Sequence, residues 1–279
     1  MTIVFLLYQK QTINWNLTLL FFVAMFLFDL TTTAINNYID SKDNDQILDF
    51  KRKTSLLIIY GLFLTSTVLG LSLAYWTDII VLLAGGACFL FGVLYTYGPL
   101  PISRQPLGEA FSGFFYGLMI PFILMYINMP EGTFLTYHLS FEAVSLELKV
   151  VPIATLLLFA ITPFCTTANI MLANNTCDLE KDIIVRRYTL PYYIGKKAAL
   201  TLFAGFYYLT YIATILMVIL GILSAICLLS LLSIFIVQKN IKMFFKKQEK
   251  STTFICSIKN FVIIMGTNTL LIFLSVFFS

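Results

Sequence analysis

Two short polar segments of this chain repeat the same residue types at the same spacing. The first is NNYIDSKDND at residues 36–45, and the second is NNTCDLEKD at residues 174–182. Each begins with two Asn residues, places an Asp four residues after the first Asn, and follows a long apolar run. Residues four apart lie on one face of a helix, so each segment presents a ladder of side-chain oxygens in one direction. The two ladders are Asn36, Asp40, Asn44 and Asn174, Asp178, Asp182.

Carboxylate and amide oxygens of this kind are ligands for hard cations such as Mg²⁺, which often holds substrate phosphates as well. Both segments also contain a cation, Lys42 and Lys181, and the second is followed by Arg186 and Arg187. Carboxylates mixed with cations suit Mg²⁺ together with a diphosphate, whose charge the cations share. The alternative, two solvated charged loops, is disfavoured because the segments share both their pattern and their position after an apolar run. The repeat therefore predicts a site for Mg²⁺ and a phosphorylated substrate.

Two further polar residues extend this prediction. Asp29 lies inside the first apolar run, at offsets that keep it roughly on the face of the first ladder. An ionisable group at that depth is costly unless it faces a polar interior, so this face is expected to line a cavity; hydrogen bonding between helices is the competing interpretation. Arg104 lies in GPLPISRQPLG, residues 98–108, where three Pro and two Gly exclude a helix and predict a rigid turn. Such an Arg suits bidentate contact with phosphate, although an anchor on the inner membrane side is equally compatible.

The composition identifies the elements that must position these residues. Of 279 residues, 59% are hydrophobic and only 11% are charged, with a mean hydropathy of +0.89. These values predict an all-α, polytopic membrane protein and exclude an ordinary soluble domain. We count about eight candidate transmembrane helices, and the longest run is expected to break at Gly221. The candidates are residues 17–35, 55–76, 79–97, 108–128, 151–173, 198–220, 222–237 and 254–278.

The basic residues predict the orientation of these spans. The loops after the first, third, fifth and seventh spans contain 15 of the 18 Lys and Arg residues. Positive loops stay in the cytoplasm, so both Asn/Asp segments and Arg104 are expected on the cytoplasmic side. The Lys cluster of residues 239–250 is interpreted as part of this topology signal rather than as a lipid-binding element.

The N-terminal residues 1–9 are about half a span long and have no basic flank before them. They are interpreted as the end of a first helix whose start is missing. The whole chain, residues 1–279, is expected to form a single transmembrane domain.

The segments LYTYGPLPISRQPLGEAFSGFFYG and NNTCDLEKDIIVRRYTLPYYIG, together with the first Asn/Asp segment, resemble the UbiA superfamily of intramembrane prenyltransferases. They are most similar to the branch that prenylates 1,4-dihydroxy-2-naphthoate in menaquinone biosynthesis. The resemblance implies a bundle of nine transmembrane helices, Mg²⁺ as cofactor, and transfer of a polyprenyl group from polyprenyl diphosphate to the naphthoate, giving demethylmenaquinone. It also implies a multi-pass protein of the plasma membrane with its active site facing the cytoplasm. The implied partners are the two substrates and the lipid bilayer, and no nucleic acid is among them.

Carried over by motif, the resemblance assigns roles to individual residues. Asp40, Asp178 and Arg104 are the expected catalytic residues. The expected metal ligands are Asn36, Asp40, Asn44, Asp45, Asn174, Asp178 and Asp182, with Asp43 an open alternative to Asn44 and Asp45. Diphosphate contacts are expected from Lys42, Arg104, Lys181 and Arg187. The substrate pocket is expected to include Asp29, Asn37, Tyr95, Tyr97 and Asn175, since aromatic faces can stabilise an allylic cation away from water.

Two alternatives remain open at this point. In the first, the enzyme transfers the prenyl group to a different ring, such as 4-hydroxybenzoate or a haem. In the second, the protein is an ion-coupled transporter whose carboxylates bind the coupling ion. The transporter requires both ladders near the middle of the membrane, whereas both follow the ends of spans on the cytoplasmic side.

Overall fold

The structure is a computed structural model that describes residues 1–43, 50–98 and 101–278; for Asp40, Lys42, Asp43 and Thr96 it describes the backbone only. The chain divides into two compact units. One contains residues 14–104, and the other contains residues 1–13 and 105–279. The two units are described separately below.

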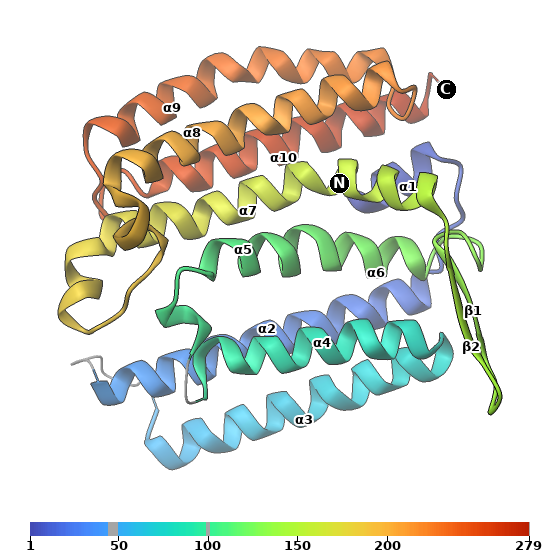
Figure 1. Ribbon diagram of the computed structural model, residues 1–279, viewed down its shortest axis with the longest axis horizontal. Helices are drawn as coiled ribbons and strands as arrows, with labels where there is room; N and C mark the ends of the chain where they lie inside the picture. The colour runs from blue at the N-terminus through green and yellow to red at the C-terminus, as the bar shows by residue number, and fades with distance from the viewer. Residues whose placement is uncertain (44–49, 99–100, 279) are drawn as a thin grey trace. The chain divides into compact units, whose positions relative to one another are not determined.

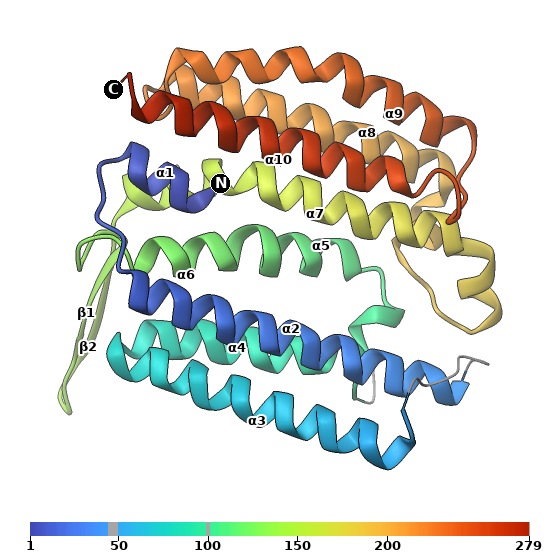
Figure 2. The same ribbon diagram turned by 180° about the vertical axis from the view of Figure 1, so that it is seen from behind.

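The smaller unit is a bundle of three helices, each antiparallel to the one before it in the sequence (Figure 2). They are α2 (Trp15–Asp43), α3 (Arg52–Trp76) and α4 (Ile79–Thr96), followed by the 3₁₀ turn η1 (Ile102–Arg104). Asp78 begins α4, since its Oδ1 accepts hydrogen bonds from the backbone N–H groups of Ile80 at 2.9 Å and Val81 at 3.2 Å. Gly92 lets α4 approach α2 closely, because a Cβ there would lie 2.6 Å from the ring of Phe28.

The larger unit is built around the long helix α7 (Val150–Ile184), which packs against α8, α10 and the segment α5–η2 (Figure 1). Its other helical elements are α1 (Thr2–Tyr8), α5 (Gly108–Ser112), the π-helix η2 (Gly113–Met119), α6 (Ile120–Tyr126), α8 (Leu190–Ile219), the 3₁₀ segment η3 (Ala225–Ser233), α9 (Ile234–Lys246) and α10 (Ile255–Val276). The short helix α1 packs on α6 and α10. At 1.5 Å per residue, the 35 residues of α7 extend about 50 Å, which exceeds the roughly 30 Å hydrocarbon core of a bilayer.

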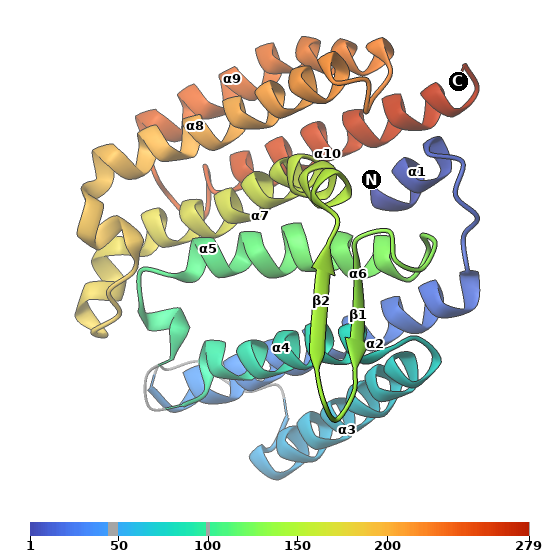
Figure 3. The same cartoon turned by 45° about the vertical axis from the view of Figure 1, so that its right-hand side comes forward.

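The prediction of an all-α membrane protein is confirmed, with one small exception. Residues between α6 and α7 form an antiparallel hairpin of β1 (Leu135–Leu139) and β2 (Val144–Leu148), with Leu135 opposite Leu148 (Figure 3). The predicted all-α fold has no strand in this stretch. Its ten strand residues are almost all exposed, so burial gives the strands no alternating pattern by which to recognise them.

All eight predicted spans coincide with helices. Within the described ranges, seven helical segments are long and apolar enough to cross a membrane, and the residues of α4 form a shorter apolar helix, Ile79–Tyr95. The predicted break at Gly221 is also confirmed, since Gly221 has a φ of 71° between α8 and η3. This positive φ is readily adopted by glycine, and it ends the long apolar run. The turn at residues 98–108 is not wholly irregular, because it contains η1.

Candidate active site

The second Asn/Asp segment forms the last turns of α7. Asn175 and Asp182 are buried, at 5% and 7% exposure, and the side chain of Asp178 is 18% exposed. These three residues are spaced by three and four positions, so they lie on one narrow arc of the helix. Asn174 is half-buried beside this arc, whereas Lys181 is exposed. The segment therefore places two carboxylates and an amide on the protected side of the helix, and the buried amide is Asn175 rather than the Asn174 of the predicted ladder.

Lys250 contacts this arc of α7, although it belongs to the loop between α9 and α10. Its Nζ forms an ion pair and hydrogen bond with Oδ2 of Asp178, and it also lies 6.0 Å from the centre of the Phe254 ring. Lys250 also acts electrostatically on Asp182, together with Arg187. The sequence analysis counted Lys250 only as a topology signal. Its sequence separation from Asp178, 72 residues, left no local pattern that could have assigned it to the site.

Hydrogen bonds around Glu249 order the loop that holds Lys250. Glu249 Oε1 accepts from Lys247 Nζ at 2.6 Å, and Oε2 accepts from the Thr252 hydroxyl at 2.9 Å. The backbone N–H of Glu249 donates to the Thr253 hydroxyl at 2.9 Å. Hydrogen bonding to Lys247, and then to Thr252, holds the pKa of this exposed carboxyl below its ordinary value. Glu249 thus stays ionised at neutral pH and fixes the turn on which Lys250 stands.

Two backbone hydrogen bonds close the C-terminal end of α7 and bring Arg187 back to Asp182. The N–H of Arg187 donates to the carbonyl of Asp182 at 2.8 Å, and that of Arg186 donates to Ile183 at 3.1 Å. This is the Schellman pattern, in which the residue at the reversal has a positive φ and is usually glycine. Here the residue is Arg186, with a φ of 55°. A strained, non-glycine reversal therefore sets the position of the predicted diphosphate contact, Arg187.

Glu109, in the first turn of α5, lies against the second segment and was missed by the sequence analysis. Its Oε1 accepts a hydrogen bond of 2.9 Å from Asn175 Nδ2, across 66 residues of sequence. Glu109 is only 3% exposed, and its Oε2 has no hydrogen-bond partner in the part of the chain that the structure describes. A single Glu in an apolar stretch is an available signal, but only the packing of α5 on α7 reveals its neighbour.

The first segment lies at the C-terminal end of α2. Asn36 is half-buried and Asn37 is exposed. Asp40 and Lys42 belong to α2, but their side chains, like that of Asp43, are outside the description, and Asn44 and Asp45 lie outside the described residues. Arg52, at the start of α3, donates a 3.3 Å hydrogen bond to the carbonyl of Tyr38, and its guanidinium lies 4.6 Å from the centre of the Tyr38 ring. A cation is thus fixed beside the first segment.

The remaining predicted residues of the smaller unit lie on three elements. Asp29 is half-buried in α2, and the neighbouring Thr32 hydroxyl donates to its backbone carbonyl at 2.9 Å. Tyr95 is half-buried in α4, and Tyr97, which ends that helix, is 65% exposed. Arg104 ends η1 and is exposed. These placements leave the expected roles of the four residues as predictions.

The oxygen donors at the end of α7 fit Mg²⁺ as the partner of a phosphorylated substrate. Among the side chains that the structure describes, which do not include those of Asp40 and Asp43, no three of His, Cys, Asp or Glu lie close enough together to hold a metal. Mg²⁺, however, commonly takes one or two carboxylates and completes its coordination with water and substrate phosphates. Asp178 and Asp182 satisfy this requirement, and Lys250 and Arg187 supply positive charge beside them.

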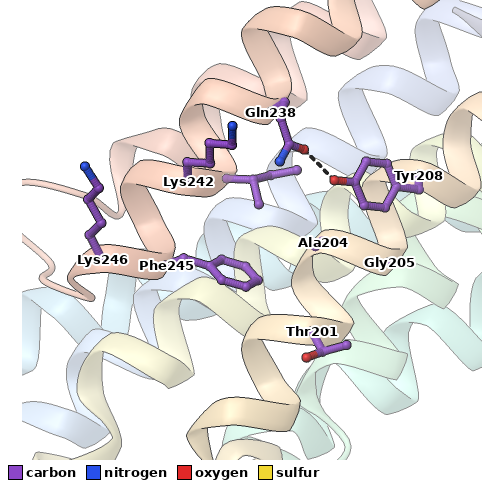
Figure 4. A pocket seen from close by; sticks show the side chains of 9 residues that line it. Thr201, Ala204, Gly205, Tyr208, Gln238, Lys242, Phe245 and Lys246 are labelled. Atoms are coloured by element: carbon purple, nitrogen blue, oxygen red, sulfur yellow. Dashed lines mark hydrogen bonds between the residues drawn. The ribbon is translucent and has the colours of Figure 1, made fainter.

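A separate groove of about 530 Å³ runs between α8 and α9 (Figure 4). Its apolar walls include Ala204 and Phe245, one end contains Lys242 and Lys246, and Tyr208 donates a hydrogen bond to Gln238 Oε1. None of the predicted site residues lines this groove. The Lys cluster of residues 239–250 therefore divides between two surroundings, since Lys250 lies with Asp178 and Lys246 lies in the groove.

The sequence is similar to known proteins over most of its length. The family model of the UbiA prenyltransferase family matches residues 1–264. The 1,4-dihydroxy-2-naphthoate octaprenyltransferase of Bacillus subtilis (strain 168) is 28% identical over 222 residues, which cover 74% of this chain and 65% of that protein. The matched region thus spans less than two thirds of that relative's length, 65%.

Two solved structures have the same fold. A UbiA homologue from Aeropyrum pernix K1, in its apo form, has a TM-score of 0.68 at 15% identity, over 95% of this chain and 93% of that one. A structure described as digeranylgeranylglyceryl phosphate synthase has a TM-score of 0.65 at 17% identity, over 100% of this chain and 92% of that one. The resemblance predicted from the two Asn/Asp segments and the segment around Arg104 is therefore confirmed, and this membrane protein belongs to the UbiA prenyltransferase family.

Proposed function

We propose that this protein transfers a polyprenyl group from polyprenyl diphosphate to 1,4-dihydroxy-2-naphthoate in a Mg²⁺-dependent reaction, giving demethylmenaquinone. Family membership supports prenyl transfer, and the similarity to a naphthoate octaprenyltransferase supports this aromatic acceptor. One observation carries the proposal: Asp178 and Asp182 lie together on the protected arc of α7, with Lys250 and Arg187 beside them. Alternating acidic and basic groups match the charges of a metal-bound diphosphate.

The cations have a definite task in this reaction. The bond between the allylic carbon and the diphosphate oxygen breaks, and the diphosphate departs with the electron pair. Lys250 and Arg187 donate charge-assisted hydrogen bonds to its oxygens as negative charge accumulates there. Bound Mg²⁺ would supply further charge neutralisation through oxygen ligands such as Asp178 and Asp182. Asp40 and the remaining oxygen donors of residues 36–45 are proposed to serve the same diphosphate chemistry.

The acceptor completes the electron balance. The ring carbon that bears the carboxylate forms a bond to the allylic carbon. The bond from that ring carbon to the carboxylate then breaks, CO₂ leaves, and its electron pair restores the aromatic ring. The product of the transfer is the prenylated hydroquinone, the reduced form of demethylmenaquinone, and the transfer itself requires no oxidant or reductant. Molecular oxygen then oxidises the hydroquinone by two electrons to the quinone that is detected.

The membrane-embedded fold suits these substrates. A polyprenyl chain is insoluble in water and reaches the protein from the bilayer, while the diphosphate needs a polar surface. We propose that this surface faces the cytoplasm of a plasma membrane, because 15 of 18 basic residues follow the first, third, fifth and seventh of the predicted spans, and positively charged segments stay in the cytoplasm. The exposed apolar residues of α2 and α3, such as Phe26, Leu57 and Leu64, are suited to contact with lipid tails.

A direct assay tests the proposal. Membranes containing the protein are incubated with an allylic polyprenyl diphosphate and 1,4-dihydroxy-2-naphthoate, with Mg²⁺ or with a chelator, and lipids are analysed by mass spectrometry. We expect prenylated naphthoquinone only when Mg²⁺ is present. Parallel reactions contain 4-hydroxybenzoate or a haem in place of the naphthoate. Product from one of these acceptors alone would retain prenyl transfer but replace the proposed acceptor.

A double substitution, Asp40→Asn with Asp178→Asn, provides the matched negative control. It preserves side-chain size and removes two carboxylates, so metal-dependent product should disappear. Full activity in this variant would overturn the assignment of the two segments to metal and diphosphate chemistry.

A further inference from the structure

Glu109 presents an unpartnered carboxylate oxygen in the interior of the larger unit. Its Oε1 is hydrogen-bonded to Asn175 Nδ2, but its buried Oε2 has no partner among the residues that the structure describes. No ion pair within that part of the chain involves Glu109 either. Leaving such an oxygen without a donor is unfavourable, because the group loses its hydration and gains nothing in return. A ligand that donates one hydrogen bond would satisfy it.

Close packing of η2 on α7 fixes the backbone that follows α5, the helix of Glu109. A Cβ on Gly113 would lie 2.9 Å from the Phe164 ring, and a Cβ on Gly117 would lie 2.3 Å from the backbone of Phe164. Glycine at these two positions lets the helices approach to backbone contact. The π-helical stretch that contains both glycines directly follows α5, the short helix that contains Glu109, and such stretches are often found at functional sites. The buried position of Glu109 is therefore set by the fold.

The neighbours of Glu109 relate it to the proposed diphosphate site. Asn175, its hydrogen-bond partner, lies on the same arc of α7 as Asp178, three residues further along. Side chains three positions apart on a helix are neighbours, with Cβ atoms separated by about 5–6 Å. A ligand that touches Glu109 Oε2 would therefore lie next to the residues that carry the phosphate chemistry.

We propose that Glu109 binds the aromatic acceptor by accepting a hydrogen bond from a ring hydroxyl group. This inference rests on the proposed function and adds to it the residue that recognises the second substrate. A carboxylate repels the acceptor's own carboxylate but pairs well with a phenolic hydroxyl. A ring hydroxyl therefore faces Glu109, and the carboxylate group is directed away from Glu109.

The same contact assists the reaction. As the carboxylate-bearing ring carbon attacks the allylic carbon, the proton of the hydroxyl on the adjacent ring carbon moves to Glu109 Oε2, and that C–O bond gains double-bond character. When CO₂ leaves, its electron pair restores the ring, and the proton returns to the oxygen. Atoms and electrons balance within the proposed reaction, with Glu109 as a temporary proton acceptor that touches the substrate.

Equilibrium binding with modified acceptors tests this contact separately from turnover. The purified full-length protein is titrated anaerobically with 1,4-dihydroxy-2-naphthoate and with each of its two mono-methyl ethers. The wild-type protein should bind one ether about 10- to 100-fold more weakly than the parent, because methylation removes a hydrogen bond to a charged group. In Glu109→Gln, the parent should bind more weakly and the difference between parent and ether should fall below about threefold.

Two further variants make the result decisive. Ser112→Ala, one turn along α5, removes a 3.5 Å hydrogen bond to the Thr167 carbonyl and should leave discrimination between the ligands intact. Should Glu109→Gln fail to fold, Glu109→Asp keeps the carboxylate and should retain discrimination at reduced affinity. Unchanged discrimination in Glu109→Gln would overturn the proposal.

The turnover assay separates this result from the proposed function. Prenylated product from the wild-type protein, together with unaltered discrimination in Glu109→Gln, would sustain the function and reject the role of Glu109. Discrimination that depends on Glu109, without prenylated product, would sustain the binding site and reject the reaction.

Discussion

Lys250 forms an ion pair with Asp178 although 72 residues separate them in sequence. The Lys250 side chain is 50% exposed and that of Asp178 is 18% exposed, so the pair is accessible to water from the lysine side. An ion pair of this exposure contributes at most about 1 kcal/mol to stability. Its position on the acidic arc of α7 suggests a different importance: Lys250 neutralises Asp178 when no substrate is bound and is placed to meet the diphosphate when one arrives.

Lys250→Ala should therefore weaken binding of the prenyl diphosphate without unfolding the protein. We expect KM for the diphosphate to rise about 10-fold or more, the size of one lost hydrogen bond between charged groups. KM for the aromatic acceptor should change little. Initial rates measured at several concentrations of each substrate provide the test.

Lys246→Ala is the matched control, because Lys246 belongs to the same basic cluster but lines the groove between α8 and α9. It removes the same charge from the same region. Equal changes in KM for Lys246→Ala and Lys250→Ala would mean that only the net positive charge of the region matters.

Lys250 also illustrates what the sequence could predict and what it could not. The eight spans and the break at Gly221 follow from hydropathy and from glycine's access to positive φ, both local properties. The ladder of Asn174, Asp178 and Asp182 follows from helical periodicity. The structure adds Asn175 as the buried Asn, and this choice depends on what packs against α7.

The partners of the second segment were not predictable in the same way. Glu109 reaches Asn175 across 66 residues, and Lys250 reaches Asp178 across 72, so both contacts exist only because separate helices pack together. The hairpin of β1 and β2 was missed for another reason: its exposed strands carry no burial pattern. Local patterns thus predicted the membrane spans and the acidic ladder at the end of α7, and tertiary packing determined the neighbours of that ladder.

At the chain reversal after α7, the contribution of the Arg186 backbone conformation can be measured separately from that of the Arg187 side chain. Arg186 adopts a φ of 55°, a conformation that costs an L-residue about 1–2 kcal/mol and glycine almost nothing. Arg186→Gly should therefore raise the free energy of unfolding by about 1 kcal/mol and keep activity, because it preserves the turn that positions Arg187. Arg187→Ala should lower kcat/KM for the diphosphate about 10- to 100-fold.

Thermal unfolding in detergent and steady-state kinetics distinguish the two effects. Loss of activity in Arg186→Gly with a normal melting temperature would show that the Arg186 side chain itself contacts substrate. Normal kinetics in Arg187→Ala would remove Arg187 from the diphosphate site.

Asp178 should be far more sensitive to substitution than its acidic neighbour Glu180. Asp178 is largely buried and paired with Lys250, whereas Glu180 is exposed on the same helix. We expect Asp178→Asn to lower Mg²⁺-dependent kcat/KM about 100-fold, the usual scale for one lost electrostatic contact to a developing charge. Glu180→Gln should remain within about threefold of wild type, since an isolated surface charge contributes little.

The Mg²⁺ dependence of the rate supplies the check on this pair. Asp178→Asn should require a higher Mg²⁺ concentration for half-maximal rate, while Glu180→Gln should follow the wild-type curve. An unshifted Mg²⁺ curve for Asp178→Asn would show that the carboxylate acts on the diphosphate or on Lys250 rather than as a metal ligand.

Gly117 determines how closely η2 can approach α7, and its replacement should be strongly destabilising. An alanine Cβ there would lie 2.3 Å from the Phe164 backbone, which cannot move aside as a flexible side chain can. Gly117→Ala should lower the free energy of unfolding by about 3 kcal/mol, at the upper end of the usual cost of overpacking. Gly205→Ala in α8 is the control, because nothing lies within 4 Å of its added Cβ. It should stabilise the helix by up to about 1 kcal/mol. Melting temperatures of both variants in one detergent test the pair, and equal stability would contradict the close contact of η2 with α7 that holds Glu109 in place.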